Sequence, residues 1–214
     1  MVKKIVMEIE NRIIKSESEL RVEYQDSNEM WVSGYALKFN QPSEILQSNG
    51  IRFIETIQPD AFTESELDDL RLLYEHDHKQ ILARSSAGTL TTEIRDEGLF
   101  FMAKLANTSY ARDVYENLRS GNVMNCSFGF NLSENGDSIR YDSERDLYLR
   151  TVEKIDKISE ITLTSIPAYK SSHVEVAIRS ITEAKEKELE DIKKNHKRKL
   201  MLELELIKLK EELN

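Results

Sequence analysis

The strongest folding signal in the chain lies at residues 123–132, which read VMNCSFGFNL. Every second residue from Met124 to Leu132 is apolar, and the residues between them are small or polar. Such alternation predicts a strand with one apolar face, because successive side chains point to opposite sides. The pattern therefore turns Cys126 into the core and Ser127 outward. Gly129 leaves room for another chain beside the Ser127 hydroxyl. Cys126 and Ser127 are adjacent candidate nucleophiles, and the pattern favours the serine.

Other segments rich in aromatic and β-branched residues predict further strands at residues 31–39, 51–57, 99–106 and 152–166. The spacing of Thr63 and Glu66 is that of a capping box, which predicts the start of a helix. A second short helix is expected at residues 109–120, closed by Gly121. Many strands with two short helices predict an α+β domain, either a β-barrel or a folded sheet carrying helices.

The charge of the chain is unevenly distributed. Residues 180–214 hold nine acidic and nine basic residues, so the net charge of -9 belongs to residues 1–179. An acidic body argues against nucleic acid as a partner, because phosphate binding needs clustered Lys and Arg. We therefore expect two parts, a domain at 1–179 and a tail at 180–214.

Cysteine content and apolar runs indicate the compartment. A single cysteine excludes an internal disulfide framework and a four-cysteine zinc site, and it fits a reducing compartment. Glu8 and Glu10 interrupt the N-terminus, so no signal peptide is expected. No apolar run approaches the ~20 residues needed to cross a bilayer. The sequence predicts a soluble, cytosolic protein without a membrane partner.

The tail differs from the body in composition. Residues 181–214 contain no Gly or Pro and consist mainly of Lys, Glu and Leu, which predicts one extended helix. The apolar second half, residues 200–209, needs a partner surface, although its heptad register is ambiguous. We expect a protein-interaction or coiled-coil tail, with a solvated helix packing on its own domain as the alternative.

Candidate chemistry gathers around a histidine pair. On a strand, His76 and His78 share a face and could bind a metal, but no motif supplies a third ligand. Glu160 lies amid apolar residues of a predicted strand, where a carboxylate must be solvated, paired or hydrogen-bonded. A histidine with a carboxylate behind it and a serine in front is the arrangement that activates a hydroxyl. Spacing alone does not show that these groups meet.

Seven short motifs occur in one order along residues 30–179. They are Gly34-Tyr35-Ala36 with Phe39, Glu55 through Pro59-Asp60-Ala61-Phe62, His76-Asp77, Gly88-Thr89-Leu90, Asp96-Glu97-Gly98-Leu99, Gly121 before Ser127-Phe128-Gly129-Phe130, and Glu160-Ile161-Thr162-Leu163 before Pro167-Ala168-Tyr169. In these motifs the sequence resembles the prohead (capsid-maturation) serine proteases of tailed bacteriophages, relatives of the herpesvirus assemblin proteases. The resemblance implies a mostly antiparallel β-barrel with a few surrounding helices, to which the predicted C-terminal helix is added.

By position, the resemblance puts the catalytic histidine at His76, the nucleophile at Ser127 and the carboxylate at Glu160. The family usually has a small or polar residue where this chain has Glu75, and Pro59-Asp60 replaces the commoner Pro-Gly. His78 has no assured counterpart, and His76 is favoured as the base because it occupies the motif position.

The implied activity is an endopeptidase working by acyl transfer, with no metal or organic cofactor. Activity is expected to fall below about pH 6.5 as the histidine base protonates. Backbone N–H groups near Ser127, Arg145 and Arg150 are unranked candidates for the oxyanion hole.

The implied substrates are scaffolding protein, the scaffolding segment of the major capsid protein, and the protease itself. The place of action is the assembling prohead in the cytoplasm of the bacterial host. The tail would dock on helical scaffold and be removed by self-cleavage, and the viral relatives suggest a homodimer. Two alternatives remain, a catalytically inactive scaffold-binding module and a cysteine peptidase using Cys126.

Overall fold

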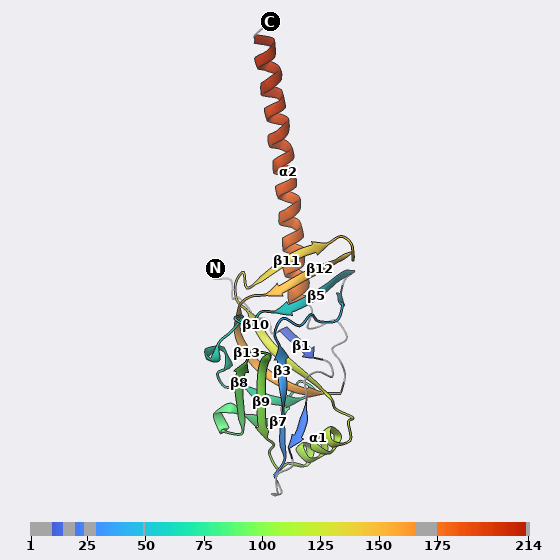
Figure 1. Ribbon diagram of the computed structural model, residues 1–214, viewed down its shortest axis with the longest axis vertical. Coiled ribbons are helices and arrows are strands. Elements are labelled where there is room, and N and C mark those ends of the chain that lie inside the picture. The colour runs from blue at the N-terminus through green and yellow to red at the C-terminus, as the bar shows by residue number, and fades with distance from the viewer. Residues whose placement is uncertain (1–9, 15–19, 24–28, 49, 166–174, 213–214) are drawn as a thin grey trace. The chain divides into compact units, whose positions relative to one another are not determined.

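The computed structural model describes residues 10–14, 20–23, 29–48, 50–165 and 175–212 (Figure 1). The chain divides into two compact units, Met1–Val176 and Ala177–Asn214. The first unit contains every strand of the described chain, and the second consists of most of helix α2 (Glu175–Glu212). An extended helix thus occupies the segment where the Lys, Glu and Leu composition predicts one, while the division at 179/180 stays a prediction. No helix of the described residues is both long enough and apolar enough to span a membrane.

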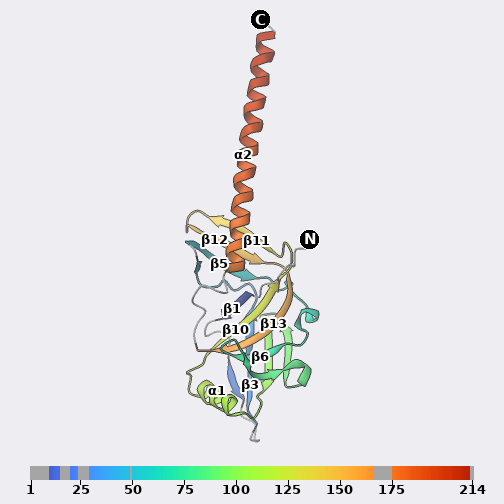
Figure 2. The ribbon, with the colours of Figure 1, turned by 180° about the vertical axis from the view of Figure 1, so that it is seen from behind.

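The five-stranded sheet, called sheet A, carries the candidate catalytic residues. Its strands follow the order β1 (Glu10–Ile14), β10 (Asn125–Leu132), β13 (Ile155–Thr164), β6 (Arg71–Tyr74) and β7 (Asp77–Arg84). Figure 2 labels four of these strands, β1, β10, β13 and β6. The alternating segment 123–132 forms β10, and its pairing with β13 is antiparallel, whereas β13 and β6 run parallel.

Two four-stranded sheets complete the first unit. Sheet B has the order β2 (Arg21–Glu23), β3 (Trp31–Lys38), β9 (Gly98–Lys104) and β8 (Leu90–Arg95). Sheet C has the order β11 (Asp137–Asp142), β12 (Leu147–Val152), β5 (Ile51–Ile57) and β4 (Leu46–Ser48), with β12 and β5 parallel. One apolar cluster joins Phe128 and Phe130 of sheet A to Leu37 and Phe101 of sheet B, so these two sheets share a core.

The prediction of a β-barrel is wrong. The described strands form three open sheets, and within the residues that the structure describes, β1 and β7, the outer strands of sheet A, do not pair with each other. Alternation of apolar and polar residues shows which face of a strand is buried, but it carries no information about which strand edges meet. Most pairings are antiparallel, as expected, but the β12–β5 and β13–β6 pairs are parallel.

The two predicted helices differ in outcome. The capping box of Thr63 and Glu66 is present, but it opens a single turn of 3₁₀ helix, η1 (Glu64–Leu67). Hydrogen bonds from Ser65 and Thr63 lower the pKa of Glu66 to about 2. The second helix is α1 (Ser109–Arg119), whose N-cap Thr108 accepts a hydrogen bond from the Ala111 backbone N–H. A further 3₁₀ turn, η2 (Ser85–Ala87), follows β7.

Sheet C buries a charged cluster on one of its faces. The Arg150 side chain is 0% exposed, and its Nη1 donates to Glu55 Oε2 at 2.5 Å. Its Nε donates to Asp137 Oδ2 at 2.6 Å. The parallel β12–β5 register sets Arg150 opposite Glu55, so the pair forms wherever these strands pair.

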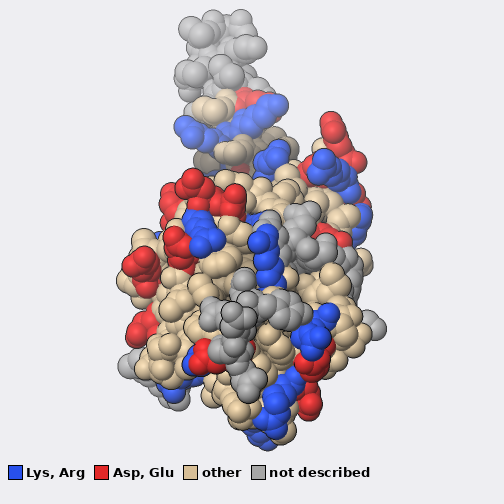
Figure 3. All heavy atoms as spheres, turned by 60° about the horizontal axis from the view of Figure 1, so that its bottom comes forward, with Lys and Arg blue, Asp and Glu red and all other residues tan. Residues whose placement is uncertain are grey.

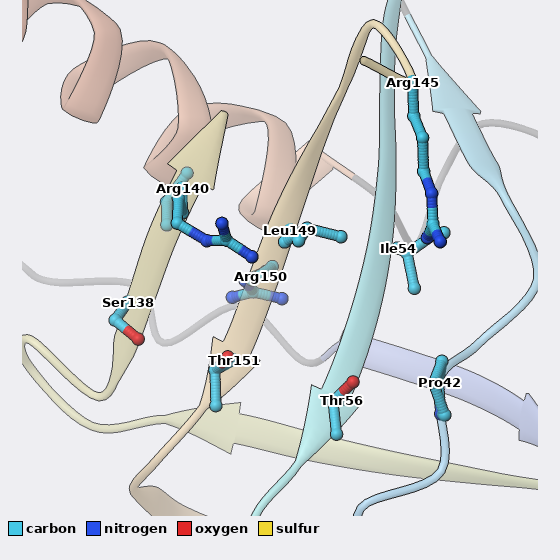
Figure 4. A pocket seen from close by; sticks show the side chains of 10 residues that line it. Pro42, Ile54, Thr56, Ser138, Arg140, Arg145, Leu149, Arg150 and Thr151 are labelled. Atoms are coloured by element: carbon cyan, nitrogen blue, oxygen red, sulfur yellow. The ribbon is translucent and has the colours of Figure 1, made fainter. Parts of the chain in front are cut away.

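The other face of sheet C carries a hollow of about 470 Å³ (Figure 4). The register places Arg140, Leu149 and Ile54 side by side across β11, β12 and β5, and Arg145 lies at the hollow as well. On the face of the first unit in Figure 3, Lys and Arg side chains are interspersed with acidic and uncharged residues.

Removal of the Arg150 side chain is expected to destabilise the first unit. Arg150→Ala leaves two carboxylates buried without their cation, which costs roughly 3–5 kcal/mol. Arg140→Ala is the matched control, because no hydrogen bond or ion pair of Arg140 occurs among the described residues, and its effect should stay within about 0.5 kcal/mol. Urea denaturation with linear extrapolation measures both. Equal losses in the two variants would contradict a stabilising role for the buried cluster.

Candidate active site

The pairing of β10 with β13 places three polar side chains on one face of sheet A. Ser127 lies opposite Thr162, and Gly129 lies opposite Glu160. Paired residues of neighbouring strands share a face, so Ser127, Thr162 and Glu160 do so. Ser127 and Glu160 are diagonal neighbours, a relation that separates residues by roughly 7–8 Å.

Ser127 lies on the face opposite Cys126, as the alternation predicts, but it does not face solvent. Both side chains are 0% exposed. Alternation distinguishes the two faces of a strand without showing what covers each of them. The prediction that Ser127 points outward is therefore correct for the face and wrong for exposure.

His76 reaches this face from the turn between β6 and β7. Tyr74 pairs with Asp77 across the hairpin, so Glu75 and His76 are the two central residues of the turn. The His76 Nδ1 and Glu160 Oε1 atoms lie 2.6 Å apart, and the two side chains are 22% and 4% exposed. With its proton on Nδ1, the imidazole donates a hydrogen bond to the carboxylate, and the lone pair on Nε2 can then accept a proton from another group.

His78 approaches the same carboxylate less closely. Its Nε2 lies 3.6 Å from Glu160 Oε2, beyond hydrogen-bond range, and its side chain is 67% exposed. The geometry therefore favours His76 over His78 as the imidazole that Glu160 orients.

Three buried polar atoms on this face have no hydrogen-bond partner among the described residues. They are Ser127 Oγ, Thr162 Oγ1 and Glu160 Oε2. An unsatisfied buried polar group costs about 1–3 kcal/mol, and native proteins keep few of them. The structure thus joins His76 to Glu160 and leaves the nearby Ser127 hydroxyl unbonded to either.

Cys126 is poorly placed for nucleophilic chemistry. Its thiol lies within the apolar cluster, and burial raises the pKa of the Cys126 thiol well above its usual range. A thiol reacts as the thiolate, so a cysteine held neutral in the core is inert.

The two arginines considered for an oxyanion hole lie elsewhere. Arg150 is on β12 of sheet C and is engaged by Glu55 and Asp137, and Arg145 lies in the turn between β11 and β12. Ser127 belongs to sheet A. Among the described residues, no group of three or more His, Cys, Asp or Glu side chains is arranged to hold a metal ion.

A comparison with known protein families matches residues 18–187 to the family described as caudovirus prohead serine protease. The chain belongs to this family. The match covers most of the chain and extends beyond both ends of the 30–179 region in which the sequence motifs were recognised, and it confirms that resemblance. The chain is therefore a serine protease of the capsid-maturation type found in tailed bacteriophages. No curated protein and no solved structure matches the chain.

Family membership does not itself identify the catalytic residues. The motif Pro167-Ala168-Tyr169 lies outside the described residues.

The sequence reasoning missed a contact of Glu75, whose carboxylate accepts hydrogen bonds from Thr164 and Ser165. The sequence held one signal of this contact, because Glu75 stands where the family usually has a small or polar residue.

Two threonines on the same face of β13 provide a test of the unsatisfied site. Thr162 Oγ1 has no partner among the described residues, whereas Thr164 Oγ1 donates to Glu75 Oε2 at 2.7 Å. Thr162→Val should leave the free energy of unfolding unchanged or raise it by up to about 1 kcal/mol. The matched variant Thr164→Val should lower it by about 1–3 kcal/mol, because a charged acceptor loses a donor. Thermal and urea unfolding measure both changes. A marked loss of stability in Thr162→Val would show that its hydroxyl is satisfied.

Proposed function

We propose that this prohead protease is an endopeptidase that works by acyl transfer with Ser127 as nucleophile, His76 as base and Glu160 as the orienting carboxylate. The observation that carries the proposal is the 2.6 Å His76–Glu160 contact beside a buried serine hydroxyl that has no partner among the described residues. An oriented imidazole and a free hydroxyl on one sheet face are the components that serine acylation needs.

The reaction proceeds in two proton-coupled steps. His76 Nε2 takes the proton of Ser127 Oγ while the oxygen attacks the scissile carbonyl carbon, and the proton passes to the leaving amine as the peptide bond breaks. Water then attacks the acyl-enzyme, gives its proton to His76, and the serine recovers its hydrogen as the acid product leaves. Throughout, Glu160 stabilises the imidazolium. Catalytic hydrogen bonds are often long without substrate, which accommodates the missing Ser127–His76 bond.

The two alternatives are less well supported by the site. A cysteine peptidase needs a thiolate, but Cys126 lies on the opposite face of β10 from Glu160, within the apolar core, where burial raises the pKa of its thiol. A non-catalytic binding module has no use for three buried polar atoms that lack partners within the described part of the chain, because each of them costs stability.

For substrates, we propose the scaffolding protein, the scaffolding segment of the major capsid protein, and the protease itself. Support comes from membership of a prohead protease family, which also suggests that the protein acts inside the assembling prohead in the host cytoplasm. The homodimer inferred from the related viral proteases stays a proposal.

Active-site labelling tests the assignment without a known substrate. A fluorophosphonate, which acylation-competent serines attack, should label the protein and Cys126→Ala at similar rates. Ser127→Ala should show no labelling, and His76→Ala should be slower by at least about 10²-fold, because the base contributes on that scale. The same variants, co-expressed with capsid protein, report cleavage by mass spectrometry. Labelling and cleavage that persist in Ser127→Ala but vanish in Cys126→Ala would assign the chemistry to the cysteine.

Helix α2 is the proposed docking element for helical scaffold. Leu189 is 48% exposed and Ile192 is 56% exposed, so this helix presents apolar side chains that a partner helix would cover. Removal of residues 181–214 should leave fluorophosphonate labelling intact and abolish packaging of the protease into proheads, measured by immunoblot of purified shells. As a control, alanine at the exposed Lys193 and Lys194 keeps the apolar residues and should preserve packaging. Normal packaging of the truncated chain would refute docking through α2.

A further inference from the structure

The turn that carries His76 has an unfavourable backbone for its residues. Glu75 and His76 have φ angles of 49° and 58°, both in the left-handed region. Two-residue hairpin turns with two such angles favour Asn-Gly or Gly-Gly, because a side chain at left-handed φ costs roughly 1–2 kcal/mol. Glu is not among the residues that adopt this region readily, so other contacts must hold the turn in this shape.

Glu75 provides those contacts. Its backbone N–H donates to the Leu163 carbonyl at 3.0 Å. Its carboxylate accepts three hydrogen bonds of 2.7 Å, from Thr164 Oγ1, the Ser165 backbone N–H and Ser165 Oγ. All these partners belong to the end of β13 or to the residue that follows it. The Glu75 side chain thus ties the turn to one end of a single strand.

The same strand carries Glu160, the hydrogen-bond partner of His76. The turn is therefore attached to β13 twice, through Glu75 at Thr164 and Ser165, and through the His76 imidazole at Glu160. Two attachments on one strand fix both the position and the direction of the ring. Burial opposes ionisation of Glu75, but the hydrogen bonds from Ser165 and Thr164 outweigh it and lower the pKa of Glu75. The carboxylate is ionised at neutral pH, which strengthens the hydrogen bonds it accepts.

We propose that Glu75 is a positioning residue that holds the His76 imidazole against Glu160 by clamping the β6–β7 turn to the end of β13. This inference rests on the proposed role of His76 as the base. It also gives a physical meaning to the departure of Glu75 from the residue usual in the family.

Three substitutions separate the clamp from the shape of the turn. Glu75→Gly suits the left-handed backbone but removes the clamp. Glu75→Gln keeps the clamp, because its oxygen can accept from Ser165 while its amide donates to the Thr164 hydroxyl. Glu134→Gln is the matched control, since Glu134 lies in an exposed turn between β10 and β11.

Labelling kinetics with the fluorophosphonate give the first readout. Glu75→Gly should lower the maximal inactivation rate by about 10- to 100-fold, the scale of a small misplacement of a catalytic group, and leave the half-saturating concentration within about twofold. Glu75→Gln and Glu134→Gln should stay within about threefold of the unsubstituted protein. A Glu75→Gly protein as fast as the unsubstituted one would show that the turn needs no clamp. If Glu75→Gln is as slow as Glu75→Gly, charge rather than position is what matters, and the proposal fails.

Proton NMR gives a second readout that needs no catalysis. In Ser127→Ala, the hydrogen-bonded Nδ1 proton of His76 should give a low-field resonance, assigned by its loss in His76→Gln. The resonance should persist when Glu75→Gln is added and disappear when Glu75→Gly is added. Loss of this resonance only with Glu75→Gly, together with a failure of the fluorophosphonate to label the unsubstituted protein, would uphold the clamp and reject the proposed function. If the resonance persists with either substitution of Glu75, the clamp alone is rejected.

Discussion

The pairing of β10 with β13 is the constraint on which the rest of the molecule depends. One register sets Ser127 opposite Thr162 and Gly129 opposite Glu160, and so gathers the polar groups on one face. The same register turns Cys126 to the other face, into the apolar cluster shared with sheet B. A slip of one residue would exchange the two faces, because side chains alternate along a strand. Core and candidate site are thus specified by the same set of backbone hydrogen bonds.

The candidate site concentrates features that lower stability. Three polar atoms that find no partner in the described part of the chain cost free energy, as does the left-handed turn at Glu75 and His76. These features lie between well-packed strands, where the core and the hydrogen bonds of Glu75 hold them in place. Local strain that persists because its surroundings over-determine it is typical of functional sites, where groups must be ready for a reaction rather than satisfied among themselves.

Local patterns predicted local structure well. The alternation at 123–132 gave β10 and the faces of Cys126 and Ser127, and the spacing near Gly121 gave α1. What depends on long-range pairing could not be derived in this way. The His76–Glu160 contact joins residues 84 positions apart, so the residue types suggested the arrangement but spacing could not show that the two side chains meet. The sequence left Arg150 among the candidates for the oxyanion hole, because its partner Glu55 lies 95 residues away, where no spacing rule could find it. The prediction of a closed barrel failed for the same reason, since composition does not determine which strand edges pair.

The position of β13 in sheet A determines when the candidate site can form. It is the last strand of the described chain, yet it lies between β10 and β6 in the sheet and supplies Glu160. A ribosome must therefore complete nearly the whole first unit before the sheet can close around its middle strand. Pairings between distant segments also slow folding, because the chain loses entropy before the contacts stabilise it. Chain order thus makes the candidate site one of the last features of the first unit that can form, because Glu160 reaches its place only when β13 enters the sheet between two strands made before it.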